Sequence, residues 1–75
     1  MSEFVLCIDN ESNPASLIVG KVYRRLPDAE AASHNSLRII DEDTSELDGY
    51  IYPSSMFVPV ELPDAAKQVL LATGS

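Results

Sequence analysis

The chain of 75 residues contains no tryptophan, a single cysteine (Cys7) and a single histidine (His34). A lone cysteine excludes an intramolecular disulfide, whereas small secreted domains usually carry an even number of cysteines. One cysteine and one histidine cannot assemble a structural zinc site within the monomer. The sequence also shows no secretory signal pattern and no run of about 18 apolar residues. We therefore expect a cytoplasmic protein that does not enter a membrane.

Catalytic motifs are missing as well. Cys7 lies in the apolar run 4–8 and is predicted to be buried and inert, whereas His34 lies in the polar run 33–36. A nucleophile and its base must meet in space, and these two side chains are not expected to do so. No glycine-rich phosphate loop is present. We predict that the protein is not an enzyme and binds no cofactor.

The acidic run 41–49 resembles a calcium loop only in its first half. It offers oxygen ligands at the first, third and fifth positions. Glu46 then replaces the glycine required at position six, and Tyr52 replaces the acid at position twelve. We therefore predict no metal site, and we expect the run to form a solvated hairpin tip.

Positive charge is scarce. The sequence has five basic and twelve acidic residues, which gives a formal net charge of −7. Such a surface repels phosphates, so nucleic acid and anionic membranes are disfavoured as partners. A basic protein partner would be attracted instead. The charge also has a simpler explanation, which is solubility.

Short β-favouring runs separated by turn residues make up most of the chain. They are residues 3–8, 21–26, 37–40, 49–52 and 56–60. Gly20 stands where a positive φ is expected, and Pro59 indicates an edge strand or a short one. Five short strands without intervening helices predict one all-β domain, either a small antiparallel barrel or a sandwich.

Two segments are not β-like. Residues 27–36 are predicted to form a loop, because the helix-favouring stretch Ala29–Ala32 is too short to nucleate a helix alone. Residues 63–72 predict a short C-terminal helix, with Pro63 in its first turn and Gly74 near its C-cap.

Three segments resemble the SH3 family. Leu6–Asn10 stands where that family has Ala-Leu-Tyr-Asp-Tyr, 17–22 resembles the turn before its second strand, and 49–58 resembles its Gly-x-Ile-Pro-Ser-Asn-Tyr-Val stretch. The Cys-Ile-Asp-Asn start and the Gly-Lys-x-Tyr strand are also similar to small bacterial and phage SH3-like proteins of largely unassigned function. The resemblance implies a five-stranded antiparallel SH3-like barrel over residues 1–61, followed by a helical extension over 62–75.

The family's proline-rich ligand is not expected here. Ile8 and Asn10 replace the two signature tyrosines, and the groove tryptophan is absent. Aromatic walls are what hold a polyproline II ligand, so the resemblance implies the architecture without that ligand.

Our leading prediction is a small non-catalytic interaction module that binds another protein or itself, with a homodimer as one outcome. Tyrosine is an efficient contact residue, and part of the aromatic set is expected to share an exposed face. The candidate protein-binding residues are Tyr23, Tyr50, Tyr52, Pro53 and Phe57. The alternative explanation is that at least two of the four aromatic residues among them pack in the core or at a sheet edge.

A second hypothesis is an acidic nucleic-acid mimic of the phage counter-defence type, which would inhibit a DNA- or RNA-binding host protein. Its candidate residues are Asp41, Glu42, Asp43, Glu46 and Asp48. The basic residues lie on the second and third strands, where they would either recognise a partner or pair with this acidic tip; they are Lys21, Arg24, Arg25 and Arg38.

Overall fold

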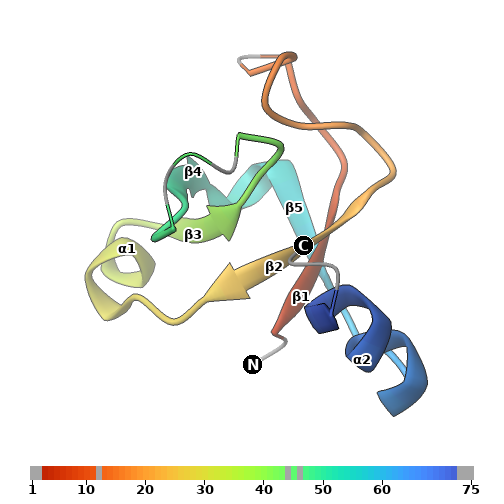
Figure 1. Cartoon of the computed structure of the whole chain (residues 1–75). Helices are drawn as coiled ribbons and strands as arrows, with labels where there is room; N and C mark the ends of the chain where they lie inside the picture. The colour runs from red at the N-terminus through yellow and green to blue at the C-terminus, as the bar shows by residue number, and fades with distance from the viewer. Residues whose placement is uncertain (1–2, 12, 44, 46, 73–75) are drawn as a thin grey trace.

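The computed structural model of the chain describes residues 3–11, 13–43, 45 and 47–72. Its strands are β1 (Phe4–Cys7), β2 (Val22–Leu26), β3 (Ser36–Ile40), β4 (Tyr50–Pro53) and β5 (Phe57–Val60). Its helices are α1 (Ala29–Ser33), the 3-10 turn η1 (Ser54–Met56) and α2 (Asp64–Ala72). The five strands form one antiparallel sheet in the order β4-β3-β2-β1-β5 (Figure 1). Each strand begins and ends within one residue of its predicted position.

The sheet is strongly curled. Its two edges, β4 and β5, are consecutive in the chain and are joined by η1, which has three residues. The edges of a flat five-stranded sheet would lie roughly 19 Å apart, whereas three 3-10 residues advance only about 6 Å. The ring centroids of Tyr52 and Phe57, one from each edge strand, are 6.0 Å apart. No strand pairing joins β4 to β5 among the described residues, so the sheet is curled but not closed.

The concave face of the sheet holds the core. Its buried side chains are Val5, Cys7, Leu17, Tyr23, Ile39, Tyr52, Met56 and Phe57. Cys7 is fully buried, as predicted. Phe4 points to the opposite face of β1 by strand alternation, yet it is only 1% exposed. Strand β1, which lies between β2 and β5, is therefore covered on both faces at Phe4 and Val5.

Pro59 lies on an edge strand, which confirms the prediction. The Ile8 N–H donates to the Met56 carbonyl at 2.9 Å. Bonded and non-bonded pairs alternate along an antiparallel ladder, so Val58 bonds to β1 whereas Pro59 does not. The missing N–H of Pro59 therefore faces the free edge, where it breaks no pairing.

Helix α1 overturns the prediction of a plain loop over 27–36. Asp28 caps the helix, since one of its carboxylate oxygens accepts the Ala31 N–H at 2.9 Å. The other oxygen accepts Arg38 Nε at 2.8 Å, which ties the cap to β3. Ala31 is also buried against the fold. Capping and tertiary contacts thus stabilise a helix too short to persist alone.

The predicted C-terminal helix is confirmed as α2. None of its described residues is buried, and Val69 is 62% exposed. A helix needs about 20 residues to cross a bilayer, and neither α1 nor α2, among the described parts of the chain, reaches that length.

Two glycines with positive φ provide a matched test of the fold. Gly20 has a φ of +89° with nothing within 4 Å of an added Cβ, whereas Gly49 has a φ of +68° and its Cβ would lie 2.3 Å from the Ile39 carbonyl oxygen. We predict that Gly20→Ala lowers the free energy of unfolding by about 1 kcal/mol through backbone strain alone. Gly49→Ala should lower it by roughly 3 kcal/mol, because the β3 backbone must also move. Urea unfolding measures both, and equal losses would contradict this view of the β3–β4 turn.

Candidate functional site

Three consecutive acids at the start of the β3–β4 loop accept hydrogen bonds from three tyrosine hydroxyls. Tyr52 donates to Asp41, Tyr23 donates to Glu42 at 2.7 Å, and Tyr50 donates to Asp43 at 3.2 Å. We call these six residues the tyrosine–carboxylate cluster. It joins strands β2 and β4 to the loop that leaves β3.

Glu42 is the most heavily engaged of the three acids. Lys21 Nζ lies 2.5 Å from its Oε2, and this ammonium, followed by the Tyr23 hydroxyl, lowers the pKa of Glu42. The Tyr23 hydroxyl also accepts the Ile18 N–H at 2.8 Å, while the Glu42 N–H donates to the Ser16 carbonyl. Burial, more than the hydrogen bond to Glu42, raises the pKa of Tyr23. The acidic loop is thereby fastened to the β1–β2 loop.

Asp41 is only 5% exposed. Its carboxylate accepts the Tyr52 hydroxyl and the Asp43 N–H, the latter at 2.9 Å. Burial, and then the hydrogen bond to Asp41, raises the pKa of Tyr52 to about 12. A buried carboxylate is costly unless such donors satisfy it, so Asp41 has a structural role.

The expected exposed aromatic face is wrong for three of its four aromatic residues, and the alternative, that at least two of them pack in the core or at an edge, is confirmed. Tyr23, Tyr52 and Phe57 are 2%, 6% and 5% exposed and belong to the core. Strand alternation explains this, since Tyr23 faces Val5 across the β1–β2 ladder on the concave side. Pro53 is exposed, and Tyr50 is half-buried against the core.

The expected acidic tip is also wrong in part, because Asp41 is buried rather than solvated. Glu42, Asp43 and Asp48 are exposed, and Glu46 lies outside the described residues. The Lys21–Glu42 pair follows the option in which the basic strands pair with the acidic tip. Arg38 instead pairs with Asp28, and its Nη1 donates to the Asp48 carbonyl at 3.1 Å.

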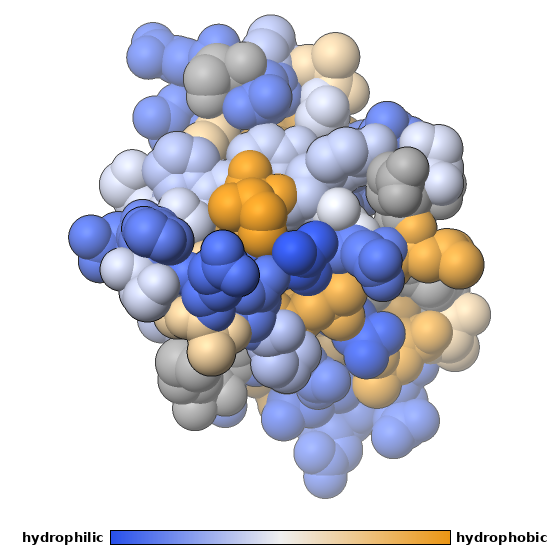
Figure 2. Space-filling model, turned by 90° about the vertical axis from the view of Figure 1, so that its left-hand side faces the viewer, coloured by the Kyte–Doolittle hydropathy of each residue, from blue (hydrophilic) through white to orange (hydrophobic). Residues whose placement is uncertain are grey.

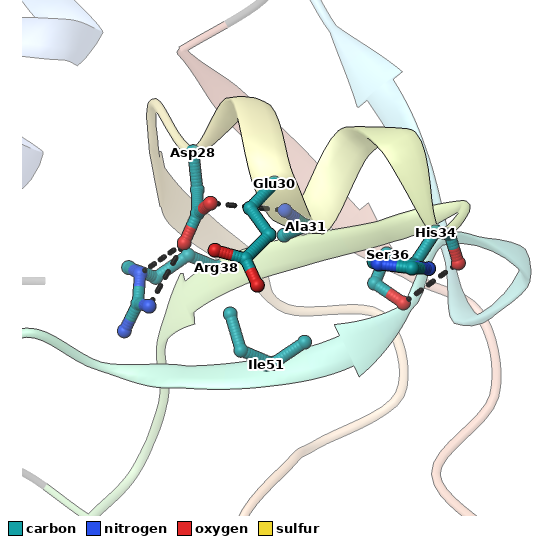
Figure 3. A pocket seen from close by; sticks show the side chains of 7 residues that line it. All are labelled: Asp28, Glu30, Ala31, His34, Ser36, Arg38 and Ile51. Atoms are coloured by element: carbon teal, nitrogen blue, oxygen red, sulfur yellow. Dashed lines mark hydrogen bonds and ion pairs between the residues drawn. The ribbon is translucent and has the colours of Figure 1, made fainter.

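A hollow of about 240 Å³ lies between α1 and the strands β3 and β4 (Figure 3). We call it the α1 groove; its lining residues are Asp28, Glu30, Ala31, His34, Ser36, Arg38 and Ile51. The Ala31 N–H, and then Arg38, lower the pKa of Asp28. Glu30, in contrast, is exposed and has no ion pair or side-chain hydrogen bond among the described residues. Its carboxylate lies between α1 and Ile51 in Figure 3.

Ile51 also lines a second hollow, of about 320 Å³, on the other side of β4. This hollow is bounded by 50–53, by Asn13 and Ser16 of the β1–β2 loop, and by Asp41 and Asp43. The Ser54 N–H donates to the Asn35 carbonyl at 2.9 Å. By ladder alternation, the backbone N–H and C=O of Ile51 then point away from β3, toward the free edge.

Ile51 is 47% exposed, and sequence reasoning missed it. The signal was available, since Ile51 alternates with Tyr50 and Tyr52 and must face outward if the tyrosines face inward. Figure 2 shows the face of the molecule that carries α1, where a compact hydrophobic spot near the centre is bordered by more hydrophilic residues and a second hydrophobic area lies toward the lower right.

Neither the described side chains nor comparisons with known proteins assign a role to this surface. Within the part of the chain that the structure describes, no three His, Cys, Asp or Glu side chains are grouped so that they could hold a metal ion. Cys7 is enclosed in the core and His34 is exposed at the end of α1, so the two do not meet. Comparisons with protein-family models, curated proteins and solved structures find no match.

The tyrosine–carboxylate cluster offers a direct stability test. Tyr23→Phe removes the hydroxyl that donates a hydrogen bond to Glu42, and it leaves the Ile18 N–H without its acceptor. We predict a loss of about 1–3 kcal/mol in the free energy of unfolding, measured in urea. Tyr50→Phe is the matched control, because its hydroxyl bond is longer and exposed and should cost less. Equal losses would show that the Tyr23 hydroxyl has no special structural role.

Proposed function

We propose that the chain is a small non-catalytic protein-interaction module and that it binds its partner at β4 and the α1 groove. We call this area the β4 edge surface; its members are Glu30, His34, Ile51 and Pro53. The observation that carries the proposal is Ile51, an apolar side chain 47% exposed on an edge strand with a hollow on either side.

The edge strand provides a recognised means of binding. An unpaired strand edge presents backbone donors and acceptors that an extended partner segment can use, while side-chain pockets supply specificity. At β4 the backbone N–H and C=O of Ile51 point toward the free edge, and Ile51 lines both the α1 groove and the second hollow. A partner segment along β4 would therefore meet backbone groups and an apolar contact at one residue.

The proposed architecture is an SH3-like barrel over residues 1–61 with a helical extension over 62–75. Support comes from the five-stranded antiparallel order and from the curl that lets η1 join the two edge strands. The proposed partner is a protein, which is either a different protein or a second copy of this chain.

The nucleic-acid mimic ranks second. A mimic depends on a row of carboxylates free to meet a basic protein, whereas Asp41 is buried, and Glu42 and Asp43 are held by Lys21 and tyrosine hydroxyls. No contact among the described residues favours it over the β4 edge surface.

Selection of a phage-displayed random peptide library on the immobilised chain tests the proposal. We predict enriched peptides whose affinity falls at least about tenfold with Ile51→Glu, as expected for a central apolar anchor. Val69→Glu, at an exposed site on α2, is the matched control and should leave the affinity unchanged. Circular dichroism and urea unfolding verify that both variants fold.

Two results would refute the proposal. One is a selection that enriches no peptide. The other is a set of peptides that bind the Ile51→Glu and Val69→Glu variants equally well, because binding would then lie away from β4. Sedimentation of the free chain over a range of concentrations shows whether the partner is a second copy.

A further inference from the structure

The α1 groove has an uneven distribution of charge. Asp28 and Arg38 neutralise each other, with Arg38 Nη2 at 2.8 Å from the Asp28 carboxylate. Glu30 adds a second carboxylate that no described residue neutralises. Two carboxylates against one guanidinium leave one net negative charge when His34 is neutral. The groove is therefore suited to a cation.

Arg38 is not available to attract an anion. Its Nε and Nη2 are bound to Asp28, and its Nη1 donates to the Asp48 carbonyl at 3.1 Å. The guanidinium is thus held by three contacts within the fold. An incoming phosphate or carboxylate would have to break them and would also meet Glu30.

The size of the groove points to a side chain rather than a small molecule. Sites for drug-sized ligands usually measure about 300–1,000 Å³, and this hollow measures about 240 Å³. Its floor includes the half-exposed Ile51, and the Glu30 carboxylate lies above that floor (Figure 3). An apolar floor beside an unpaired carboxylate matches a side chain with an aliphatic stem and a positive end.

We propose that the α1 groove binds a lysine or arginine side chain of the partner segment that lies along β4. This inference rests on the proposed function and names the chemistry of the partner. The aliphatic stem packs on Ile51, and the charged end reaches the Glu30 carboxylate. The net charge of −7 on the whole chain attracts a basic segment from a distance, so association weakens as salt rises.

The test compares charged and neutral versions of the same peptide. Each enriched peptide is synthesised with arginine and with citrulline, which keeps the shape and removes the charge, or with lysine and with norleucine. We predict that the neutral replacement lowers the affinity at one basic position by about three- to fivefold, the scale of an exposed ion pair. With Glu30→Gln the difference between the two versions should disappear.

Glu11→Gln is the matched control, because Glu11 is an exposed acid in the β1–β2 loop and does not line the groove. It should leave the charged-to-neutral difference intact. An independent probe, n-butylguanidinium, should shift the backbone amide resonances of Ala31 and Ile51 in a saturable way, whereas the neutral 1-pentanol should not.

The outcomes separate this inference from the proposed function. One outcome is that the peptides depend on Ile51 for binding yet bind equally well in their charged and neutral versions. That result would overturn the proposal that the α1 groove binds a basic side chain, and it would leave the proposal of an interaction module intact. A charge dependence that persists in Glu30→Gln would likewise overturn the assignment to the α1 groove. Binding of a single-stranded RNA oligonucleotide at Ile51 in preference to peptides would overturn both.

Discussion

The rest of the structure depends on the hydrogen bonding of three successive carboxylates to three tyrosines. Asp41, Glu42 and Asp43 leave β3 together, and each meets a hydroxyl from β2 or β4. These bonds pull the β3–β4 loop onto the curled sheet, and Lys21 and Ile18 extend the same network into the β1–β2 loop. A small domain has a thin core, so polar contacts such as the buried Tyr52–Asp41 bond and the partly buried Tyr23–Glu42 bond help to specify one arrangement of its loops.

This cluster also determines which surfaces remain for function. Tyrosines and acids that looked available for contact are used within the fold, so the candidate surface moves to Ile51 and the α1 groove. Side chains alternate along β4, so Ile51 faces outward because Tyr50 and Tyr52 face inward. The internal role of the tyrosines and the exposure of Ile51 are therefore two consequences of one strand register.

Local patterns predicted the elements, whereas pairing between distant residues remained hidden. The strand boundaries, the edge position of Pro59 and helix α2 follow from alternation, from the missing N–H and from helix signals within each segment. The burial of Asp41 does not, because it depends on Tyr52, eleven residues away. Helix α1 was missed because propensity alone ignores the cap that Asp28 provides and the contact of Asp28 with Arg38.

The most direct test of the cluster is a double-mutant cycle on Tyr52 and Asp41, with Tyr52→Phe, Asp41→Ala and the pair measured by urea unfolding. If the carboxylate and the hydroxyl stabilise each other inside the fold, the coupling free energy should be about 1–3 kcal/mol. Losses that add to within about 0.3 kcal/mol would contradict the account, because the acid and the tyrosine would then act independently.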